Sequence, residues 1–160
     1  GYALVLSDFY AVSQQYPFGL SQLDDQFLVR ASGGVTMYTN SGLTSGVHVS
    51  AGGGSWSSVS DRALKENFVP VDTQALLARL AEIPISTWNY KAEDPSVRHM
   101  GPMAQDLHAA FGLGDSDKSI STIDASGLSI AAIQGLYELV KEMQAENARM
   151  REAMERAGIE

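Results

Sequence analysis

The chain contains no cysteine, so it has neither a disulfide framework nor a thiolate metal site. Its 11 basic residues are outnumbered by 19 acidic ones, and the net charge of -8 argues against nucleic acid as a partner. No apolar run approaches the roughly 20 residues that span a bilayer, so we expect no membrane partner. The histidines His48, His99 and His108 follow no metal-ligand spacing, and the triglycine 52–54 is not followed by the Gly-Lys-Ser/Thr of a phosphate loop. We therefore expect no metal and no other cofactor.

Charge is also scarce in the first part of the chain. Residues 1–60 hold four charged side chains but nine of the 15 glycines. The pattern predicts strands over 27–31 and 35–39 around a turn at 32–34, and a third strand over 46–50. Strands this short and glycine-rich bury too little apolar surface to stand alone. A fibre stem in which three chains share one core would remove that difficulty; a β-meander packed on the later helices is the alternative.

The rest of the chain is charged and predicted to be mainly helical. Asp72 can cap a helix that runs to Pro84. Residues 85–90 alternate between apolar and polar side chains, as a strand does. Pro102 suits the first turn of a further helix, which Gly112 would end.

A final helix, capped by Asp124 or Ser126, carries the clearest periodicity in the chain. Its side chains recur with a 3-4 spacing that is typical of the seam of a left-handed coiled coil. The seam residues are Ile133, Leu136, Val140, Met143, Asn147, Met150 and Met154. Asn147 at an a position is typical of a residue that fixes register between helices. A single amphipathic helix packed on its own domain is the alternative.

Ser60 and Lys65 lie five residues apart, where the glycine-rich region changes into the charged one. A lysine kept neutral by partial desolvation can act as the general base for a serine nucleophile, which suggests a chain that cuts itself. Leu64 and Phe68 could supply the apolar cover, and Asp61 could either orient the lysine or be a simple surface aspartate. The spacing by itself also fits a solvated turn followed by a surface lysine.

Four motifs occur in order along the second half of the chain. They are Ser-Asp-x-x-x-Lys-Glu-Asn at 60–67, Trp-Asn-Tyr at 88–90, His-Met-Gly-Pro-Met-Ala-Gln-Asp at 99–106 and Ser-Thr-Ile-Asp at 121–124. Together they resemble the peptidase S74 family, the C-terminal intramolecular chaperone domains of phage endosialidases, tailspikes and tail fibres. The resemblance extends over roughly residues 60 to 155.

The resemblance implies an α+β homotrimer in three parts. Residues 1–59 would be a β-rich stem segment that ends an upstream fibre protein, residues 60–125 an auto-processing chaperone domain, and residues 126–160 a coiled-coil helix. It makes Ser60 the nucleophile and Lys65 its base, and it places the cut at Ser60-Asp61. The candidate supporting residues are His99, Glu66 and Asn67. For His99, a packing or hydrogen-bonding role is the alternative.

The implied function is that of an intramolecular chaperone. It would trimerise, template the folding of the upstream β-rich part of its own polypeptide, and then release itself in a single turnover of serine peptidase chemistry. The product would belong to a phage tail appendage assembled in the bacterial cytoplasm, or alternatively to a bacterial cell surface. The competing function is a non-catalytic trimerisation domain of a phage fibre or bacterial adhesin.

Overall fold

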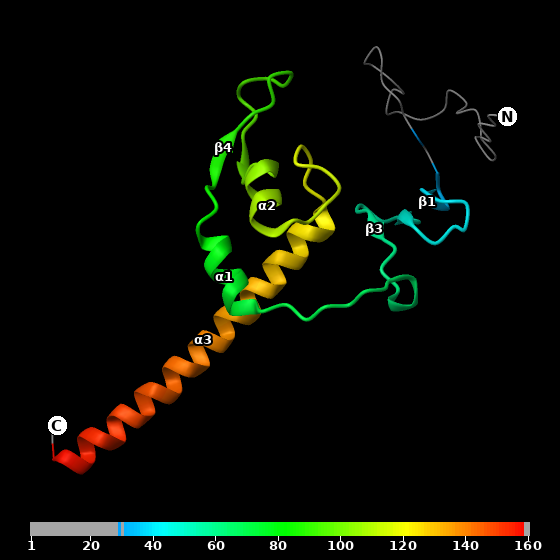
Figure 1. Ribbon diagram of the computed structural model, residues 1–160. Helices are drawn as coiled ribbons and strands as arrows, with labels where there is room; N and C mark the ends of the chain where they lie inside the picture. Colours follow the sequence, from blue (N-terminus) through cyan, green and yellow to red (C-terminus); the bar gives the residue numbers. More distant parts are fainter. Residues whose placement is uncertain (1–28, 30, 159–160) are drawn as a thin grey trace. The chain divides into compact units, whose positions relative to one another are not determined.

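The computed structural model describes residue 29 and residues 31–158. The chain divides into two compact units, residues 1–67 and residues 68–160. The first unit contains the strands of a small sheet, and the second is mainly helical and ends in one long helix (Figure 1). The predicted mixed α+β class, with strands toward the N-terminal side and a long C-terminal helix, is confirmed.

The sheet of the first unit has three antiparallel strands in the order β1-β2-β3. They are β1 (Gly34–Tyr38), β2 (Gly46–Ser50) and β3 (Ser57–Ser58), with Thr36 opposite His48 in the register. Two of the three predicted strands are therefore present, and β1 pairs with β2. The predicted strand over 27–31 falls largely outside the described residues, and the two that are described, Val29 and Ala31, belong to no strand.

A side chain in the loop between β1 and β2 stabilises the turn that pairs these two strands. Asn40 Oδ1 accepts from the backbone N–H groups of Thr44 and Ser45 at 3.0 and 3.2 Å, and Asn40 Nδ2 donates to Thr44 Oγ1 at 2.7 Å. Asparagine favours such local turns because its amide can replace a backbone partner. At Gly46 a Cβ atom would collide with the Met37 carbonyl, so the close pairing of β1 and β2 needs glycine there.

The core of the second unit is small. Among the described residues, the buried apolar side chains are Leu76, Ile83 and Leu128. Leu76 lies on α1 (Thr73–Ala81) and Leu128 lies on α3 (Thr122–Ala157), and these two helices pack against each other (Figure 1). Asp72 caps α1 as predicted, since its Oδ1 accepts from Ala75 N at 2.9 Å.

Helix α1 approaches α3 most closely at Gly135, one of the two buried residues of α3. A Cβ atom at Gly135 would collide with the Thr73 carbonyl. Two side chains in the first turn of α1 also reach α3. Thr73 Oγ1 donates to Glu138 Oε2 at 2.8 Å, and Gln74 Nε2 donates to Glu142 Oε1 at 3.0 Å. Glycine therefore lets the start of α1 rest directly on the α3 backbone.

A two-stranded antiparallel hairpin follows α1, formed by β4 (Ser86–Trp88) and β5 (His99–Gly101). Strand β4 is shorter than the predicted 85–90, because the Tyr90 N–H leaves the ladder and donates to Glu93 Oε2 at 3.1 Å. Helix α2 (Ala104–Phe111) comes next. Met103 is its N-cap, so Pro102 lies just before the helix and not in its first turn, while Gly112 ends it in the left-handed conformation as predicted.

Helix α3 begins earlier than predicted. Ser121 is its N-cap, and Ser121 Oγ accepts from Asp124 N at 3.4 Å, so the prediction of Asp124 or Ser126 as the cap is wrong. Asp124 instead lies in the first turn, where a carboxylate interacts favourably with the helix dipole. The helix ends at Gly158, in the left-handed conformation. None of the helices within the described residues is long and apolar enough to cross a lipid bilayer.

Candidate functional site

Ser60 and Lys65 are brought together by a single short turn. Between them lies η1 (Arg62–Leu64), one turn of 3-10 helix. Lys65 Nζ donates to Ser60 Oγ at 2.6 Å. The amine and the hydroxyl that the sequence pairs are thus in direct contact within six consecutive residues.

Asp61 begins this turn. It is the N-cap of η1, and its Oδ1 accepts from Ala63 N at 2.9 Å. Two backbone bonds close the turn, from Leu64 N to the Asp61 carbonyl and from Lys65 N to the Arg62 carbonyl, both 3.2 Å. Aspartate is a favoured N-cap because its short side chain satisfies an otherwise unpaired N–H. Asp61 is therefore a capping residue of the turn that carries the pair.

The Ser60–Lys65 pair is open to solvent in the single chain. Both residues are exposed, and so are the two side chains expected to cover them, Leu64 at 48% and Phe68 at 62%. A lysine base has to be partly neutral, which requires desolvation, because its ordinary pKa lies near 10.4. In one copy of the chain, the Lys65 side chain is exposed.

The next two residues of the motif lead the chain away from the turn. Glu66 is exposed, and Asn67 has a positive φ of 56°. Asparagine is one of the few residues other than glycine that adopt this left-handed conformation readily. Asn67 therefore redirects the backbone at the last residue of the first unit.

His99 belongs to the second unit and lies in an aromatic cluster. It stands opposite Trp88 in the β4-β5 register, with ring centroids 4.8 Å apart, and its ring centroid lies 5.5 Å from that of Tyr90. The Trp88 and Tyr90 rings meet edge to face at 4.9 Å. His99 Nε2 lies 2.9 Å from Glu93 Oε2. The packing and hydrogen-bonding role considered for His99 is what these contacts describe.

Glu93 was not singled out by the sequence analysis, although it anchors the loop between the strands. Its hydrogen bond to His99 lowers the pKa of the Glu93 carboxyl, a bond from the Tyr90 backbone acts in the same direction, and desolvation opposes both. Arg98 was missed as well: its guanidinium donates to Thr87 Oγ1 at 2.9 Å and to Asn89 Oδ1 at 3.2 Å. A signal for both was the presence of opposite charges, Glu93 and Arg98, in the segment between the predicted strand over 85–90 and the motif at 99–106.

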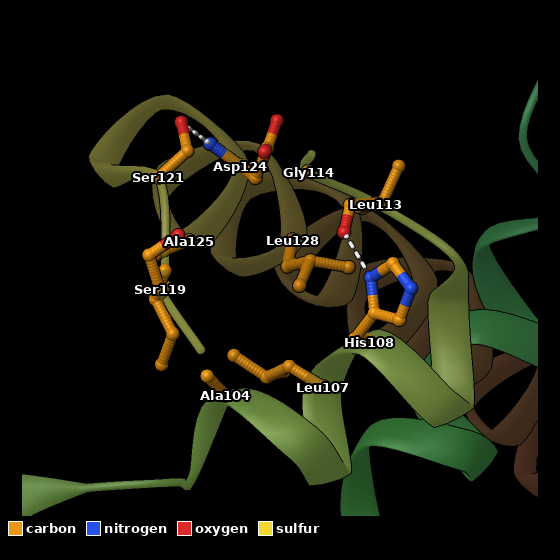
Figure 2. Close-up of a pocket in the computed structure, with 11 residues that line it drawn as sticks. Ala104, Leu107, His108, Leu113, Gly114, Ser119, Ser121, Asp124, Ala125 and Leu128 are labelled. Carbon is orange, nitrogen blue, oxygen red and sulfur yellow. Dashed lines mark hydrogen bonds between the residues drawn. The ribbon is translucent and has the colours of Figure 1, made fainter. Parts of the chain in front are cut away.

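A shallow hollow lies between α2 and the start of α3 (Figure 2). It is lined mainly by apolar side chains, among them Leu107 and Leu128, with His108 and Asp124 at its edge. His108 Nδ1 lies 2.9 Å from the Leu113 carbonyl oxygen, so this histidine holds the segment that follows α2. Throughout the described residues there is no group of three or more His, Asp or Glu side chains that could hold a metal ion.

The predicted seam residues all lie on exposed positions of α3. They are Ile133, Leu136, Val140, Met143, Asn147, Met150 and Met154. In the heptad assignment, the residues that contact α1 occupy the c and f positions: Gly135 and Glu142 are at c, and Glu138 is at f. Positions c and f lie about half a turn from a and d on a helix of 3.6 residues per turn. The apolar seam therefore faces away from α1.

No curated protein matches the chain. One family model does, over residues 60–112: that of the peptidase S74 family, described as chaperone of endosialidase. The matched segment begins at Ser60, contains the turn with Lys65, α1, the β4-β5 hairpin and α2, and ends at Gly112, the C-cap of α2. Three of the four motifs fall inside it, and the match confirms the family that they resemble. Residues 60–112 of this chain are thus a peptidase S74 segment, of the family described as chaperone of endosialidase.

Proposed function

We propose that this chain is an intramolecular chaperone that trimerises through α3, templates the folding of the β-rich part of its own polypeptide, and then releases itself by autoproteolysis at Ser60-Asp61. The observation that carries the proposal is the 2.6 Å hydrogen bond between Lys65 Nζ and Ser60 Oγ, inside the segment that matches a peptidase family. Ser60 is the nucleophile and Lys65 is its base.

The chemistry follows from this pair. A neutral Lys65 amine takes the proton of the Ser60 hydroxyl as Oγ bonds to a peptide carbonyl carbon. The C–N bond then breaks, and the Lys65 ammonium gives its proton to the departing amine. Water hydrolyses the ester, which leaves a free carboxylate and restores the hydroxyl. No cofactor enters these steps.

The bond that is cut constrains which copy of the chain attacks it. If the Ser60 hydroxyl attacked its own carbonyl carbon, it would form a strained four-membered lactone. The Ser60 hydroxyl of a neighbouring copy has no such restriction, so cleavage of Ser60-Asp61 runs between copies. This accounts for a pair that is solvent-exposed in one chain, because a neighbouring copy would bring both the substrate bond and the desolvation that a lysine base needs.

Trimerisation is supported by the uncovered face of α3. Ile133 is 66% exposed and Val140 is 41% exposed, on the side of the helix opposite α1. Apolar a and d positions of this kind are stabilised when two or more helices pack their seams together. The heptads do not specify the number of helices; three is the number implied by the resemblance.

The chaperone role is supported by the contrast in burial between the units. All the buried apolar side chains of the described residues, Leu76, Ile83 and Leu128, belong to the second unit. Strand registers that lack a buried face are weakly specified, and non-local pairing is slow because loops must close before contacts form. A trimeric template would set the register. Once the template is cut away, the persistence of the stem would depend on slow unfolding.

The family is described as chaperone of endosialidase, and the mature product is accordingly proposed to be part of a phage tail appendage. A bacterial cell surface is the alternative location. A second function, a trimerisation domain without cleavage, is favoured by one observation: in a single chain Ser60 and Lys65 are both exposed.

The decisive measurement is intact mass over time in purified, protease-free material. Wild-type protein is expected to yield a fragment that begins at Asp61, and cleavage should accelerate from about pH 6 to pH 9 as more of the Lys65 amine becomes neutral. Ser60→Ala and Lys65→Ala should each stay whole, and so should Lys65→Arg because the guanidinium stays charged. A wild-type chain that remains whole while trimeric across this range would leave only the non-catalytic function.

Mixed trimers test the attack between copies. A tagged Ser60→Ala chain, coexpressed with untagged wild-type chain, should be cut after residue 60 because the wild-type neighbour supplies the hydroxyl. If the tagged chain stays whole in mixed trimers while the wild-type chain is cut, each copy attacks itself. Trimers that contain only Ser60→Ala chains are the control.

A further inference from the structure

The geometry of the Ser60–Lys65 pair depends on the residue between them that starts η1. Asp61 has extended backbone angles, φ -66° and ψ 135°, and Arg62 enters the 3-10 turn directly after it. Its carboxylate accepts the Ala63 N–H at 2.9 Å. The turn is three residues long and none of them is buried, so no core packing holds it.

An aspartate at this position could act through its charge or as a helix cap, and the two roles require different properties of the side chain. An electrostatic role toward the lysine would require a negative charge near the amine. A capping role requires a short side chain with an oxygen that reaches the second N–H of the turn, which asparagine supplies as well as aspartate. The observed acceptor contact is the one to Ala63, which is the capping geometry.

We infer that Asp61 is a positioning residue for self-cleavage: it caps η1 and thereby holds Lys65 Nζ against Ser60 Oγ. This inference rests on the proposed function. Without the cap, the turn would lose the side-chain bond at its start, and the two backbone bonds that close it are both long at 3.2 Å. An exposed 3-10 turn has poor hydrogen-bond geometry, so it would then sample other conformations in which the amine and the hydroxyl lie apart.

A crossed pair of substitutions separates the two roles. Asp61→Asn keeps a capping oxygen and removes the charge, whereas Asp61→Glu keeps the charge and loses the short capping geometry. Cleavage followed by intact mass should proceed in Asp61→Asn at a rate within about twofold of wild type. Asp61→Glu and Asp61→Ala should both be slower by about fivefold or more, the factor expected when a helix cap is lost. Residue 61 also carries the departing amine, so these rates are measured on a tagged Ser60→Ala chain that keeps Asp61 and is cut in mixed trimers by untagged chains carrying the Asp61 variant. The bond being cut is then the same in every comparison.

The pH profile gives a second readout. If Asp61 acted through its charge, removing that charge in Asp61→Asn would make Lys65 easier to deprotonate and move the rise in rate to lower pH. If Asp61 acts as a cap, the cleavage rate of Asp61→Asn should rise over the same pH range as that of wild type. Fast cleavage by Asp61→Glu together with slow cleavage by Asp61→Asn, or a profile moved to lower pH in Asp61→Asn, would overturn the inference.

Amide hydrogen exchange distinguishes a failure of this inference from a failure of the proposed function. In the full chain carrying Ser60→Ala, the Ala63 N–H should exchange about fivefold faster with Asp61→Ala or Asp61→Glu than with Asp61→Asn. Equal exchange in all three variants would show that Asp61 does not hold the turn, whether or not the wild type cleaves. If the protein never cleaves but shows the predicted exchange pattern, Asp61 caps the turn and the proposed self-cleavage is wrong.

Discussion

The two compact units of this chain achieve order in different ways. The second unit has a core, small as it is, in which Leu76 of α1 and Leu128 of α3 are buried and the first turn of α1 rests on Gly135. The described part of the first unit has a paired sheet and polar loops, but its side chains reach no comparable burial. Hydrogen bonds can fix local geometry, whereas the free energy that holds a domain together comes mainly from burying apolar surface.

Helix α3, in the second unit, has both a covered face and an exposed apolar face. One of its faces packs on α1, and the opposite one carries an apolar seam that stays exposed in a single chain. The comparison shows that α3 is covered by α1 on one face, whereas the apolar seam on the opposite face is exposed in a single chain. The predictions below test each side of that division, starting with the largest expected effect.

Breaking the seam should dissociate the assembly. Ile133→Asp with Val140→Asp would place carboxylates in the middle of the proposed interhelical contact, where each would be desolvated without a partner. We expect a monomer by light scattering at micromolar concentration, with α3 still helical near α1. Gln134→Asp with Ala148→Asp is the matched control, since both of these exposed residues lie at b positions away from the seam.

A second substitution in the seam should stabilise the assembly instead of breaking it. Asn147→Ile should raise the melting temperature while loosening the preference for one oligomer, because a polar residue at an a position exchanges stability for register. A wild-type chain that is monomeric at micromolar concentration would contradict both expectations. An Asn147→Ile variant that melts earlier would show that Asn147 is not between helices.

Gly135→Ala tests the contact that the chain makes on its own. Alanine would gain about 1 kcal/mol in helix propensity, but its Cβ would collide with the Thr73 carbonyl, and forced repacking of this kind costs about 1–3 kcal/mol. We expect a net loss of stability of about 1 kcal/mol in denaturant unfolding, with the hydrogen bonds from Thr73 and Gln74 to α3 weakened.

Gly127→Ala is the control for that experiment. It lies on the same helix, and a Cβ there meets nothing within 4 Å. Only the propensity term applies, so this variant should be more stable than wild type by about 0.5–1 kcal/mol. Stabilisation by both substitutions would show that α1 does not press against α3 at Gly135.

The smallest expected effect concerns the Glu93–His99 contact within the hairpin. The hydrogen bond to His99 lowers the pKa of Glu93 below its ordinary 4.5, so its contribution to stability is present above about pH 4.5 and is lost as the pH falls through the lowered value. The melting temperature of wild type should therefore fall more steeply below pH 4.5 than that of Glu93→Gln.

Asp94→Asn is a useful comparison for that measurement. The pKa of Asp94 is lowered by its hydrogen bonds to the Ser96 side chain and backbone, so it contributes a similar dependence that does not involve His99. Adding Glu93→Gln to Asp94→Asn should make the fall in melting temperature below pH 4.5 shallower still. Identical profiles for wild type and Glu93→Gln would show that the contact with His99 contributes nothing to folding.

Local signals were sufficient for much of the fold. The Asp72 cap, the strand over 46–50 and the Gly112 stop were predicted because each depends on a few neighbouring residues. The cap of α3 was misplaced because Ser121, Asp124 and Ser126 are all suitable capping residues. The structure places the cap at Ser121, and a local window cannot choose among three residues that are all suitable.

The sequence by itself determined the pairing of Ser60 with Lys65, the heptads of α3 and the family, because each is written in residues close together along the chain. The structure also showed, locally, that Asp61 caps the turn between them. Only the tertiary structure decided that His99 is engaged with Glu93 and Trp88, and that Gly135 carries the start of α1. It also decided that the seam is the face of α3 that α1 leaves uncovered. A periodic pattern marks a helix face as apolar, but which face is covered depends on where a distant segment packs.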